Sequence, residues 1–482
     1  MAIKGFKRKI KLLEMMTEDE VESIHVATLD VLKETGVKFE SKWALDFLKK
    51  NDCIVDYDDM RVRFPESLVE ENIRKAPSSF RVKAREEKND QILGGNTVYF
   101  QNCPGMKTID LDTFEPRPPT KSEYCDYIRV LDALPNVHGL SCYPYFGYEG
   151  VHPVMAIPES LAIKIINSSK FIESCYASNC EIFNIKMAKV SGIEILSGSH
   201  ASSPLTIGKP AIMNVRRMIE AGFPIFVSNG CVYGGTGPAT AAGALTVGNA
   251  EILSQVLLAQ LIKPRTRILV FEVTFPMNMK TGSPYFGQIA DSIENVMFNQ
   301  IWRKYKLPIA NGSVGLGGAK NIGFQSGYER GISCILSALS GANLIQFHGH
   351  VFGELSAHPI QAVLDDDIAG MVGRFIEGEL VNSETIALDL IKKVGPIPGC
   401  YLNTDHTRKW WKREQYITKV ADNLSYDEWI DGGKKNDIDY AKEIMDDIIA
   451  KHKSLPLDYE KIEEIGEILK EAREYYKEKG VL

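Results

Sequence analysis

A regular alternation of short apolar runs and longer helical stretches most restricts the fold of this 482-residue chain. Between about residues 120 and 395, runs rich in Ile, Val and Phe begin roughly every forty residues, and each precedes a stretch with helical apolar spacing. The clearest runs are FPIFVSN (223–229), RILVFEV (267–273), PIANG (308–312) and NLIQFHG (343–349). This alternation is typical of βαβ units, so it predicts parallel strands joined by crossover helices.

The number of such units favours an α/β fold of the (β/α)8 TIM-like barrel type. Two weaker runs, HGLSCYPYFG (138–147) and SKFIESCYAS (169–178), raise the total to about seven or eight units. The alternative is an open, doubly wound sheet, which needs a phosphate-binding fingerprint or a topological switch point. The segment GSVGLGGAKNIG has glycines but lacks the full G-x-G-x-x-G spacing after a strand.

The chain divides into three predicted regions. Residues 1–120 are expected to form an N-terminal α+β cap, which opens with a helix capped by Thr17 and Glu20 and stopped by Gly36. Residues 121–400 are expected to form the barrel. Residues 401–482, dense in Lys, Glu and Asp, are expected to form a C-terminal helical extension packed on it.

Charge and composition exclude several classes of function. The net charge is -7, from 56 Lys and Arg against 63 Asp and Glu, so no overall attraction to nucleic acid is expected. No stretch approaches the roughly 18 unbroken apolar residues of a membrane span, and the N-terminus lacks the pattern of a secretory signal. The nine cysteines contain no C-x-x-C pair, which indicates reduced thiols. A cytoplasmic protein with no nucleic-acid or membrane partner is expected.

In a barrel of this type, chemistry is found at the carboxyl ends of the strands. Most of the residues that close the apolar runs are aromatic or neutral and polar, and only one is an acid. This composition is unusual for a hydrolase. These residues are Tyr143, Tyr145, Phe146, Asn229, Tyr233, Glu272, Asn311, Gln346, His348 and His350.

Three groups of polar or charged residues need separate interpretation, and the first two allow more than one. His348 and His350 could be a zinc pair, could contact substrate or could be satisfied by backbone groups; no third ligand is evident, so no bound metal is predicted. Glu272 should face either a barrel arginine or a cationic ligand, because an unpaired buried carboxylate is costly. The acid run at residues 365–367 precedes helical sequence and is expected at a helix N-terminus.

Three segments carry a resemblance to a known family. They are GGTGPATAAGALTVGNAEILSQVLLAQL, FQSGYERGISCILSALSGANLI, and LDDDIAGMVGRFIEG followed by ETIALDLIKKVGP. Over at least about residues 200 to 400, in the same order, the chain resembles the trimethylamine methyltransferase superfamily. The resemblance implies a (β/α)8 barrel and transfer of a methyl group from a methylated amine to the cobalt of a separate small corrinoid protein.

The chain departs from the founding trimethylamine enzymes at one loop. Those enzymes carry pyrrolysine near the loop that reads GLGGAKNIGFQSGYE here, and this loop has only ordinary residues. The chain therefore resembles the non-pyrrolysine branch, whose members demethylate quaternary amines such as glycine betaine, proline betaine or carnitine. A quaternary amine leaves as a neutral tertiary amine, so the reaction requires no general acid.

The resemblance suggests which residues bind substrate. Aromatic faces hold a cation that cannot donate a hydrogen bond, and a carboxylate adds attraction at longer range. The aromatic candidates are Tyr99, Phe100, Tyr143, Phe146, Phe347 and Phe352. Glu272 is the candidate anion, while His348, His350 and Asn311 are candidate donors to a betaine carboxylate. Gln325 and Glu329 are candidates for the pocket or the start of a helix.

Glycine betaine is the preferred substrate. The alternatives are another betaine (proline betaine, carnitine or γ-butyrobetaine), a non-catalytic betaine-binding or docking protein, and a zinc-dependent methyltransferase. No D-x-H-x-x-G corrinoid-binding motif is present, so the corrinoid (cobalamin) is expected on the partner protein. A homo-oligomer is compatible with the sequence.

Overall fold

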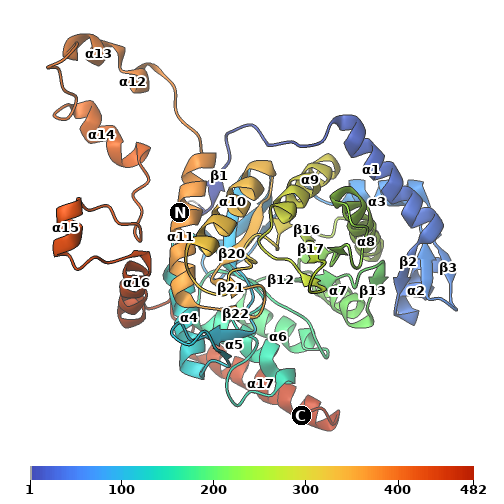
Figure 1. The fold of residues 1–482 in the computed structure, drawn as a ribbon. Helices are drawn as coiled ribbons and strands as arrows, with labels where there is room; N and C mark the ends of the chain where they lie inside the picture. The colour runs from blue at the N-terminus through green and yellow to red at the C-terminus, as the bar shows by residue number, and fades with distance from the viewer. Residues whose placement is uncertain (1–2) are drawn as a thin grey trace.

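Eight parallel strands form a closed barrel at the centre of the molecule (Figure 1). The computed structural model describes residues 3–482. Strands β7 and β20 pair with each other and close the sheet. The barrel strands are β7 (Thr97–Asn102), β10 (Gly139–Leu140), β11 (Phe171–Glu173), β12 (Ile195–His200), β14 (Ile225–Ser228), β16 (Ile268–Glu272), β19 (Ile309–Asn311) and β20 (Leu344–His348). The predicted (β/α)8 barrel is confirmed, and the open sheet is excluded.

One helix follows each strand and packs on the outside of the barrel. These helices are α4 (Lys121–Ala133), α5 (Ala156–Asn167), α6 (Glu181–Ser191), α7 (Lys209–Ala221), α8 (Ala241–Ile262), α9 (Ile289–Tyr305), α10 (Phe324–Ser340) and α11 (Pro359–Ile376). Two barrel strands were not identified as such from the sequence. Strand β7 lies before residue 121, inside the expected cap, and β12 reads ILSGSH, whose Gly and Ser residues weaken the apolar pattern.

Helix α4 begins at a complete capping box. The Thr120 hydroxyl accepts from the Glu123 amide at 3.2 Å, and the Glu123 carboxylate accepts from the Thr120 amide at 2.7 Å. We expect Thr120→Ala to lower the free energy of unfolding by about 1 kcal/mol, because it leaves an amide of the first turn without its acceptor. Urea denaturation measures the loss. Ser122→Ala in the same turn is the control, and an equal loss in both variants would contradict the role of the cap.

Helices and short strands alternate in the N-terminal region before β7. Helix α1 (Glu18–Asp30) begins at the Thr17 capping box, and Gly36 ends its last, π-helical turn with a φ of 76°, as predicted. The remaining elements are β1 (Phe6–Lys7), β2 (Val37–Phe39), α2 (Lys42–Lys49), β3 (Ile54–Asp56), β4 (Arg61–Arg63), α3 (Glu66–Lys75), β5 (Ser79–Val82) and β6 (Gln91–Gly94). Helices α1 and α3 pack on α8, whereas the β5–β6 hairpin lies under the barrel.

Two sets of short strands lie in the loops that follow the barrel strands. One sheet contains β8 (Lys107–Ile109), β9 (Pro116–Arg117), β21 (His350–Phe352) and β22 (Ser356–Ala357). The other contains β15 (Val232–Tyr233), β17 (Phe275–Asn278) and β18 (Ser283–Pro284). β13 (Thr206–Ile207) instead joins β2 of the cap. Short strands therefore surround the carboxyl end of the barrel.

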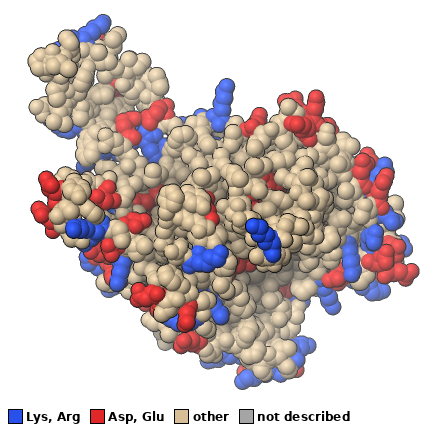
Figure 2. All heavy atoms as spheres, in the orientation of Figure 1, with Lys and Arg blue, Asp and Glu red and all other residues tan. Residues whose placement is uncertain are grey.

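The C-terminal region divides into a projecting part and a packed part. After α11, the short helices α12 (Ser383–Ile386), α13 (Leu388–Val394), α14 (Asp405–Glu414) and α15 (Tyr426–Asp431) extend away from the body (Figure 1). Helix α16 (Asp437–Lys451) returns to pack on α11 and α4. Charged side chains are spread along the outer edges of the molecule (Figure 2).

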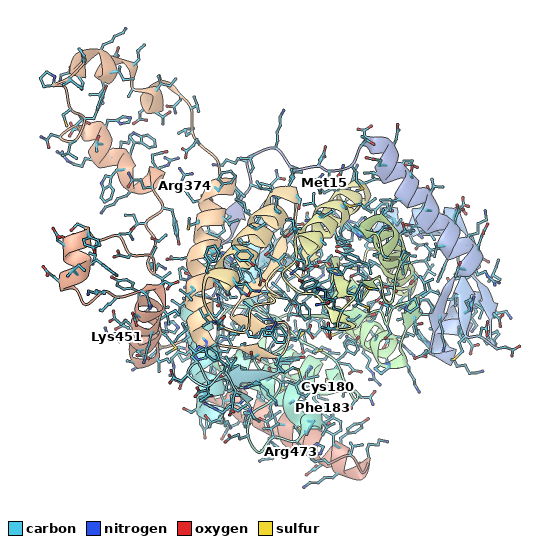
Figure 3. All side chains as sticks on the ribbon, in the orientation of Figure 1. Met15, Cys180, Phe183, Arg374, Lys451 and Arg473 are labelled. Atoms are coloured by element: carbon cyan, nitrogen blue, oxygen red, sulfur yellow. The ribbon has the colours of Figure 1, made fainter. Side chains whose placement is uncertain are left out.

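The last helix, α17 (Tyr459–Glu478), packs the C-terminal end of the chain against the helices of the barrel. The Phe183 ring of α6 packs edge-on against Tyr475 and Tyr476, and Arg473 forms an ion pair with Glu159 of α5 (Figure 3). These contacts place α17 against α5 and α6. Helices α16 and α17 thus pack on the barrel helices, whereas α14 and α15, also within residues 401–482, project away from the body.

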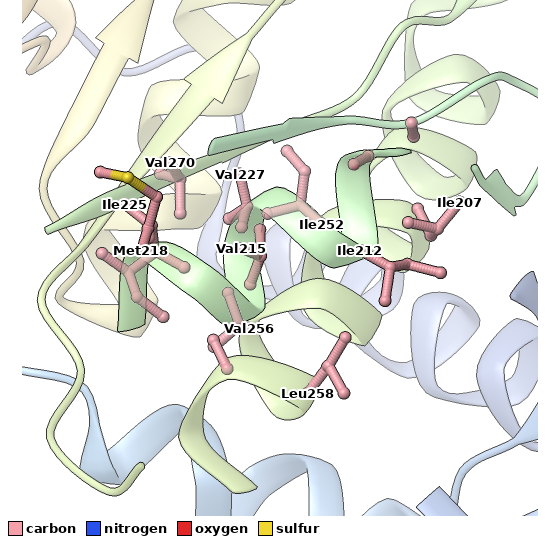
Figure 4. Close-up of a cluster of buried hydrophobic side chains, with 14 of the residues drawn as sticks. Ile207, Ile212, Val215, Met218, Ile225, Val227, Ile252, Val256, Leu258 and Val270 are labelled. Atoms are coloured by element: carbon pink, nitrogen blue, oxygen red, sulfur yellow. The ribbon is translucent and has the colours of Figure 1, made fainter. Parts of the chain in front are cut away.

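The main apolar core lies between the barrel wall and its helices. Ile252 and Val256 of α8 and Val215 of α7 meet Val227 and Val270 of the strands (Figure 4). Among the described helices, α8 alone is long and apolar enough to cross a membrane, and 78% of its most apolar window is buried inside the protein. Burial on nearly every side explains its continuous apolar sequence.

The acid run at residues 365–367 is not at a helix N-terminus, as the sequence analysis expected. Helix α11 begins six residues earlier, at Pro359, so these acids are buried in the middle of the helix. Each has its own partner: Asp365 pairs with Arg330, Asp366 accepts from the Asn136 amide, and Asp367 accepts from the amides at 419 and 420. Specific buried contacts, and not the helix dipole, account for the run.

Candidate functional site

The amino-terminal end of the barrel is closed by apolar side chains. Phe80, Val82 and Leu93 of the β5–β6 hairpin pack against barrel-interior residues such as Phe171 and Phe226. Large side chains therefore fill the lower barrel, and the carboxyl end of the strands is the end at which a ligand can enter.

A carboxylate lies inside the barrel directly above this apolar layer. Glu173 ends β11 on the same face as Phe171, so its side chain points inward. Its Oε2 accepts from Gln101 Nε2 at 2.7 Å, and its Oε1 accepts from Cys142 Sγ at 3.0 Å. Gln346 of β20 adds a longer contact of 3.4 Å to Oε2. Four neighbouring strands thus contribute to one polar cluster, which we call the Glu173 cluster: Gln101, Cys142, Glu173 and Gln346.

Neutral donors hold Glu173, and within residues 3–482 it makes no direct ion pair. The ammonium group of Lys164 lies nearby but donates to the carbonyl oxygens of residues 141, 142 and 173 at 2.6–2.7 Å. Burial raises the pKa of Glu173, and the hydrogen bonds and Lys164 only partly oppose this effect. A cation bound beside Glu173 would stabilise the ionised form of this carboxylate.

Cys142 acts as a thiol donor in this cluster. Its contact with Cys175 and its burial raise the pKa of the thiol well above the ordinary value. The proton therefore stays on sulfur and is available to Glu173.

Aromatic and imidazole side chains lie at or after the carboxyl ends of β10 and β12. Tyr143 and Phe146 follow β10, and their ring centroids are 5.3 Å apart in an edge-to-face arrangement. At the end of β12, the His200 ring stacks on Tyr176 at 6.3 Å and packs on Phe226 at 5.0 Å. Half-buried aromatic rings at the same end of the barrel as a buried carboxylate are suited to an organic cation.

Glu272, the acid selected from the sequence, lies on the other side of the barrel wall. Phe271 points into the barrel, so Glu272 points outward under α9. It accepts from the Thr274 amide at 2.5 Å and from the Ser313 hydroxyl at 2.7 Å. Its neighbours on α9 are Asp291 and Glu294, and no basic side chain of residues 3–482 pairs with the three acids.

Glu272, Asp291 and Glu294, which we call the outer acid cluster, make the free energy of unfolding depend on pH. Burial raises the pKa of Glu272 to about 7, and burial together with Glu272 raises that of Glu294 well above its ordinary value. The folded protein therefore holds protons that the unfolded chain releases, so the free energy of unfolding falls as pH rises from about 4.5 to about 7. We expect Glu294→Gln to reduce this fall by about 1–2 kcal/mol.

Urea denaturation at pH 5 and pH 8 measures this effect. The control is Glu463→Gln, which changes an exposed carboxylate of α17. An unchanged fall in stability in Glu294→Gln would contradict the role of the outer acid cluster.

The candidate donors to a betaine carboxylate are also outside the barrel interior. Asn311 exchanges hydrogen bonds of 2.9 and 3.0 Å with Asn299 of α9. The His348 ring faces Asp366 of α11, with 3.9 Å between Nε2 and Oδ1. His350 donates through Nε2 to the carbonyl oxygen of Pro104. Burial lowers the pKa of both histidines, so both are neutral at pH 7.

The remaining candidates are dispersed. Phe100 and Phe347 pack outward beneath α10 and α11, and Tyr99 lies low in the barrel, where its hydroxyl accepts from the Ile92 amide. Phe352 lies in a loop, with the Lys320 ammonium 4.5 Å from its ring centroid. Tyr143 and Phe146 are in contact with each other in the loop after β10, at the carboxyl end of the barrel.

Gln325 and Glu329 organise the loop between β19 and α10. Glu329 accepts from Gln325 Nε2 at 2.7 Å and from the Gly318 amide at 2.8 Å. The two residues are at the start of α10, one of the two positions expected for them. Through Glu329 they fix the glycine-rich loop that reads GLGGAKNIG.

Sequence reasoning missed most of the Glu173 cluster, although Gln346 was identified as a strand-end residue. A signal for Glu173 was present: FIE (171–173), like ILVFE, ends an apolar run with a lone acid. Gln101 belongs to a strand assigned to the cap, and Cys142 was interpreted with the other cysteines as a core residue.

Comparison with known proteins identifies the family. A family model described as trimethylamine methyltransferase (MTTB) matches residues 1–149 and 172–475. The chain belongs to the trimethylamine methyltransferase family. It is therefore a methyltransferase of this family, as the resemblance implied.

Members of the trimethylamine methyltransferase family match along most of the chain. A glycine betaine methyltransferase of Desulfitobacterium hafniense (strain Y51) is 28% identical and covers 86% of this chain and 88% of its own length. A trimethylamine methyltransferase MttB of D. hafniense (strain DSM 10664 / DCB-2) is 29% identical and covers 95% and 94%. The fold is also that of the Methanosarcina barkeri monomethylamine methyltransferase MtmB, with a TM-score of 0.52 at 12% identity over 98% of this chain and 89% of MtmB.

Proposed function

We propose that this protein transfers a methyl group from a quaternary amine, with glycine betaine as the preferred substrate, to the cobalt(I) of a corrinoid carried by a separate protein. The observation that carries the proposal is the buried Glu173 carboxylate inside the barrel, held by the neutral donors Gln101 and Cys142, with Tyr143 directly after Cys142 in the chain. Similarity to a glycine betaine methyltransferase supports the choice of substrate.

The chemistry of a quaternary ammonium explains why this site suits it. Such a cation cannot donate a hydrogen bond, so its counter-ion can keep all its bonds to the protein. Glu173 has this property, because it is already held by Gln101 and Cys142 and acts only through its charge. The rings of Tyr143 and Phe146 add cation–π attraction of about 2 kcal/mol or more when the contact is desolvated.

The reaction itself is a methyl displacement. The electron pair of cobalt(I) forms the new bond to the methyl carbon, and the electrons of the breaking C–N bond remain on nitrogen, which leaves as a neutral dimethylamine group. No proton is transferred, so the barrel needs to supply only orientation, exclusion of water and charge stabilisation. Glu173 and the two rings orient the ammonium end. We expect the hydroxyl of the half-buried Tyr143 to donate to the substrate carboxylate.

An anaerobic spectral assay tests the proposal. Glycine betaine, proline betaine, carnitine, γ-butyrobetaine and trimethylamine are added separately to enzyme and reduced cobalamin, and loss of cobalt(I) absorbance is followed. We expect methylcobalt to form with glycine betaine and not with trimethylamine. Turnover of trimethylamine alone, or silence across the panel even with a cognate corrinoid protein, contradicts the proposed function.

A further inference from the structure

Two cysteines meet at the carboxyl ends of neighbouring barrel strands. Cys142 is the second residue after β10, and Cys175 is the second residue after β11, the strand that pairs with β10. The two thiols are in hydrogen-bond contact with each other. Cys142 Sγ also donates to Glu173 Oε1 at 3.0 Å. A pair of thiols therefore lies directly beside the buried carboxylate of the barrel.

Lys164 of α5 holds the two strand ends together where the cysteines lie. Its ammonium group donates to the carbonyl oxygens of Cys142 and Glu173 at 2.7 and 2.6 Å. Neighbouring strands lie about 4.8 Å apart. This spacing is within the range of about 4.4–6.8 Å that separates the Cα atoms of two bonded cysteines. A disulfide between Cys142 and Cys175 is therefore compatible with the paired strands.

The two thiols differ in acidity. The hydrogen bond from Cys142 lowers the pKa of Cys175 against the opposing effect of burial, and the Tyr176 amide and the Lys164 ammonium add to this lowering. The pKa of Cys142 is raised, so this thiol keeps its proton. Because the thiolate is the reactive form of cysteine, Cys175 is the nucleophile of the pair and Cys142 is its protonated neighbour.

Cys175 combines this acidity with partial exposure. It is half-buried at the carboxyl end of the barrel. Burial instead raises the pKa of five cysteines of the interior: Cys53, Cys103, Cys180, Cys231 and Cys334. Cysteines that respond to oxidants are typically acidic, accessible and next to a second cysteine that completes the disulfide. Cys175 and Cys142 together have these three properties.

We propose that Cys142 and Cys175 are a redox-sensitive pair that hydrogen peroxide converts to a disulfide, and that this disulfide weakens substrate binding at Glu173. The effect on the substrate rests on the proposed function, whereas the formation of the disulfide does not. Peroxide also oxidises cobalt(I), so the pair responds to the conditions under which the methyl acceptor is lost.

The oxidation takes two steps. The Cys175 thiolate attacks one oxygen of hydrogen peroxide, the O–O bond breaks, and hydroxide leaves while a sulfenic acid forms on Cys175. This hydroxide takes the proton of Cys142 and becomes water. The Cys142 sulfur then attacks the Cys175 sulfur, so that the S–S bond forms and the S–O bond breaks. The second hydroxide takes a proton from solvent, and the two sulfurs have given two electrons to peroxide.

The disulfide changes the Glu173 site because it removes the hydrogen atom of the Cys142 thiol. Glu173 Oε1 then loses its donor at 3.0 Å, while Gln101 still donates to Oε2 at 2.7 Å. The hydrogen bond from Cys142 lowers the pKa of Glu173, so its loss raises that pKa further. A neutral carboxylic acid does not attract an ammonium group, so the oxidised protein binds the substrate more weakly.

Thiol counting and peptide mapping test the formation of the disulfide. One equivalent of hydrogen peroxide is added to the folded protein, which is then unfolded, alkylated and digested without reductant. We expect two free thiols fewer than the nine of the untreated chain, and one linked pair of peptides that contain Cys142 and Cys175. Dithiothreitol should restore all nine thiols. Cys175→Ser should give no linked peptides.

Cys400→Ser is the matched control, because Cys400 is exposed and lies between α13 and α14, outside the barrel. This variant should form the same disulfide as readily as the unaltered protein. Circular dichroism and thermal melting confirm that both variants are folded. An unchanged thiol count in the unaltered protein overturns the proposal, as does a disulfide that joins Cys175 to Cys180.

Calorimetric titration with glycine betaine tests the effect on the substrate site. We expect the affinity to fall at least about tenfold after peroxide treatment, because a hydrogen bond to a charged group is lost, and to recover after dithiothreitol. The affinity of Cys175→Ser should change less than about twofold under the same treatment. Unchanged affinity of the disulfide form overturns the proposal. Absence of binding in the reduced protein contradicts the proposed function, on which the thiol count and the peptide map do not depend.

Discussion

Glu173→Gln is expected to lower kcat/KM for glycine betaine at least 100-fold. The substitution keeps the shape of the side chain and removes its charge. A unit charge about 5 Å from the ammonium contributes about 3 kcal/mol at an effective dielectric constant of 20, which corresponds to a factor of more than 100. Steady-state turnover with reduced cobalamin measures the loss.

Glu272→Gln is the matched control, because Glu272 is also a strand-end glutamate but lies behind the barrel wall. We expect its kcat/KM to stay within about threefold of the unaltered enzyme. Equal losses in the two variants, or full activity in Glu173→Gln, would show that the carboxylate inside the barrel is not the counter-ion of the substrate.

The largest loss of stability is expected from Arg330→Met. Arg330 and Asp365 are almost completely buried and form two hydrogen bonds of 2.5 Å between α10 and α11. The guanidinium also donates to the carbonyl oxygen of Gly315 at 2.8 Å and to that of Phe347, so it connects both helices to the loop after β19 and to strand β20. Removal of one partner leaves Asp365 buried without a counter-ion, which costs about 3–5 kcal/mol.

Chemical denaturation measures this loss. The double variant Arg330→Met/Asp365→Leu should recover part of it, because no isolated charge then remains. The exposed pair of Arg408 and Asp405 is the control, and Arg408→Met should change the free energy of unfolding by less than about 0.5 kcal/mol. A loss below about 1 kcal/mol in Arg330→Met would contradict a structural role for the buried pair.

The barrel could be predicted from the sequence because each βα unit carries its own local signal. The runs at 223–229 and 267–273 are apolar, are followed by long helical stretches, and form β14 and β16 as predicted. Strand β12 lacked this signal because Ser197, Gly198 and Ser199 interrupt its apolar pattern. Gly198 is required there, since a Cβ would lie 1.8 Å from the carbonyl oxygen of Phe226.

The candidate site was harder to predict because it depends on which face of each strand is turned inward. Glu173 and Glu272 both end apolar runs, and the sequence around them does not distinguish the two faces. The barrel turns Phe171 and Glu173 inward on β11, whereas on β16 it turns Phe271 inward and Glu272 outward. A shift of one residue in register exchanges the two faces of a strand, and closure of the sheet sets that register.

The direction in which each aromatic candidate points was equally hard to predict from the sequence. Tyr143 and Phe146 lie in the loop after β10, at the carboxyl end of the barrel, and their rings contact each other. Phe100 and Phe347 are within or next to strands and point to the helices. Residues that follow a strand were therefore placed better from the sequence than residues inside one.

The most direct test of the account is a calorimetric comparison of two ligands of nearly identical shape. Glycine betaine carries a positive nitrogen, and 3,3-dimethylbutanoate has a neutral carbon in its place. We predict that the enzyme binds glycine betaine at least tenfold more tightly than the neutral ligand, and that Glu173→Gln removes most of this difference. Equal affinity of the unaltered enzyme for both ligands would contradict the claim that the barrel recognises a quaternary ammonium through the charge of Glu173.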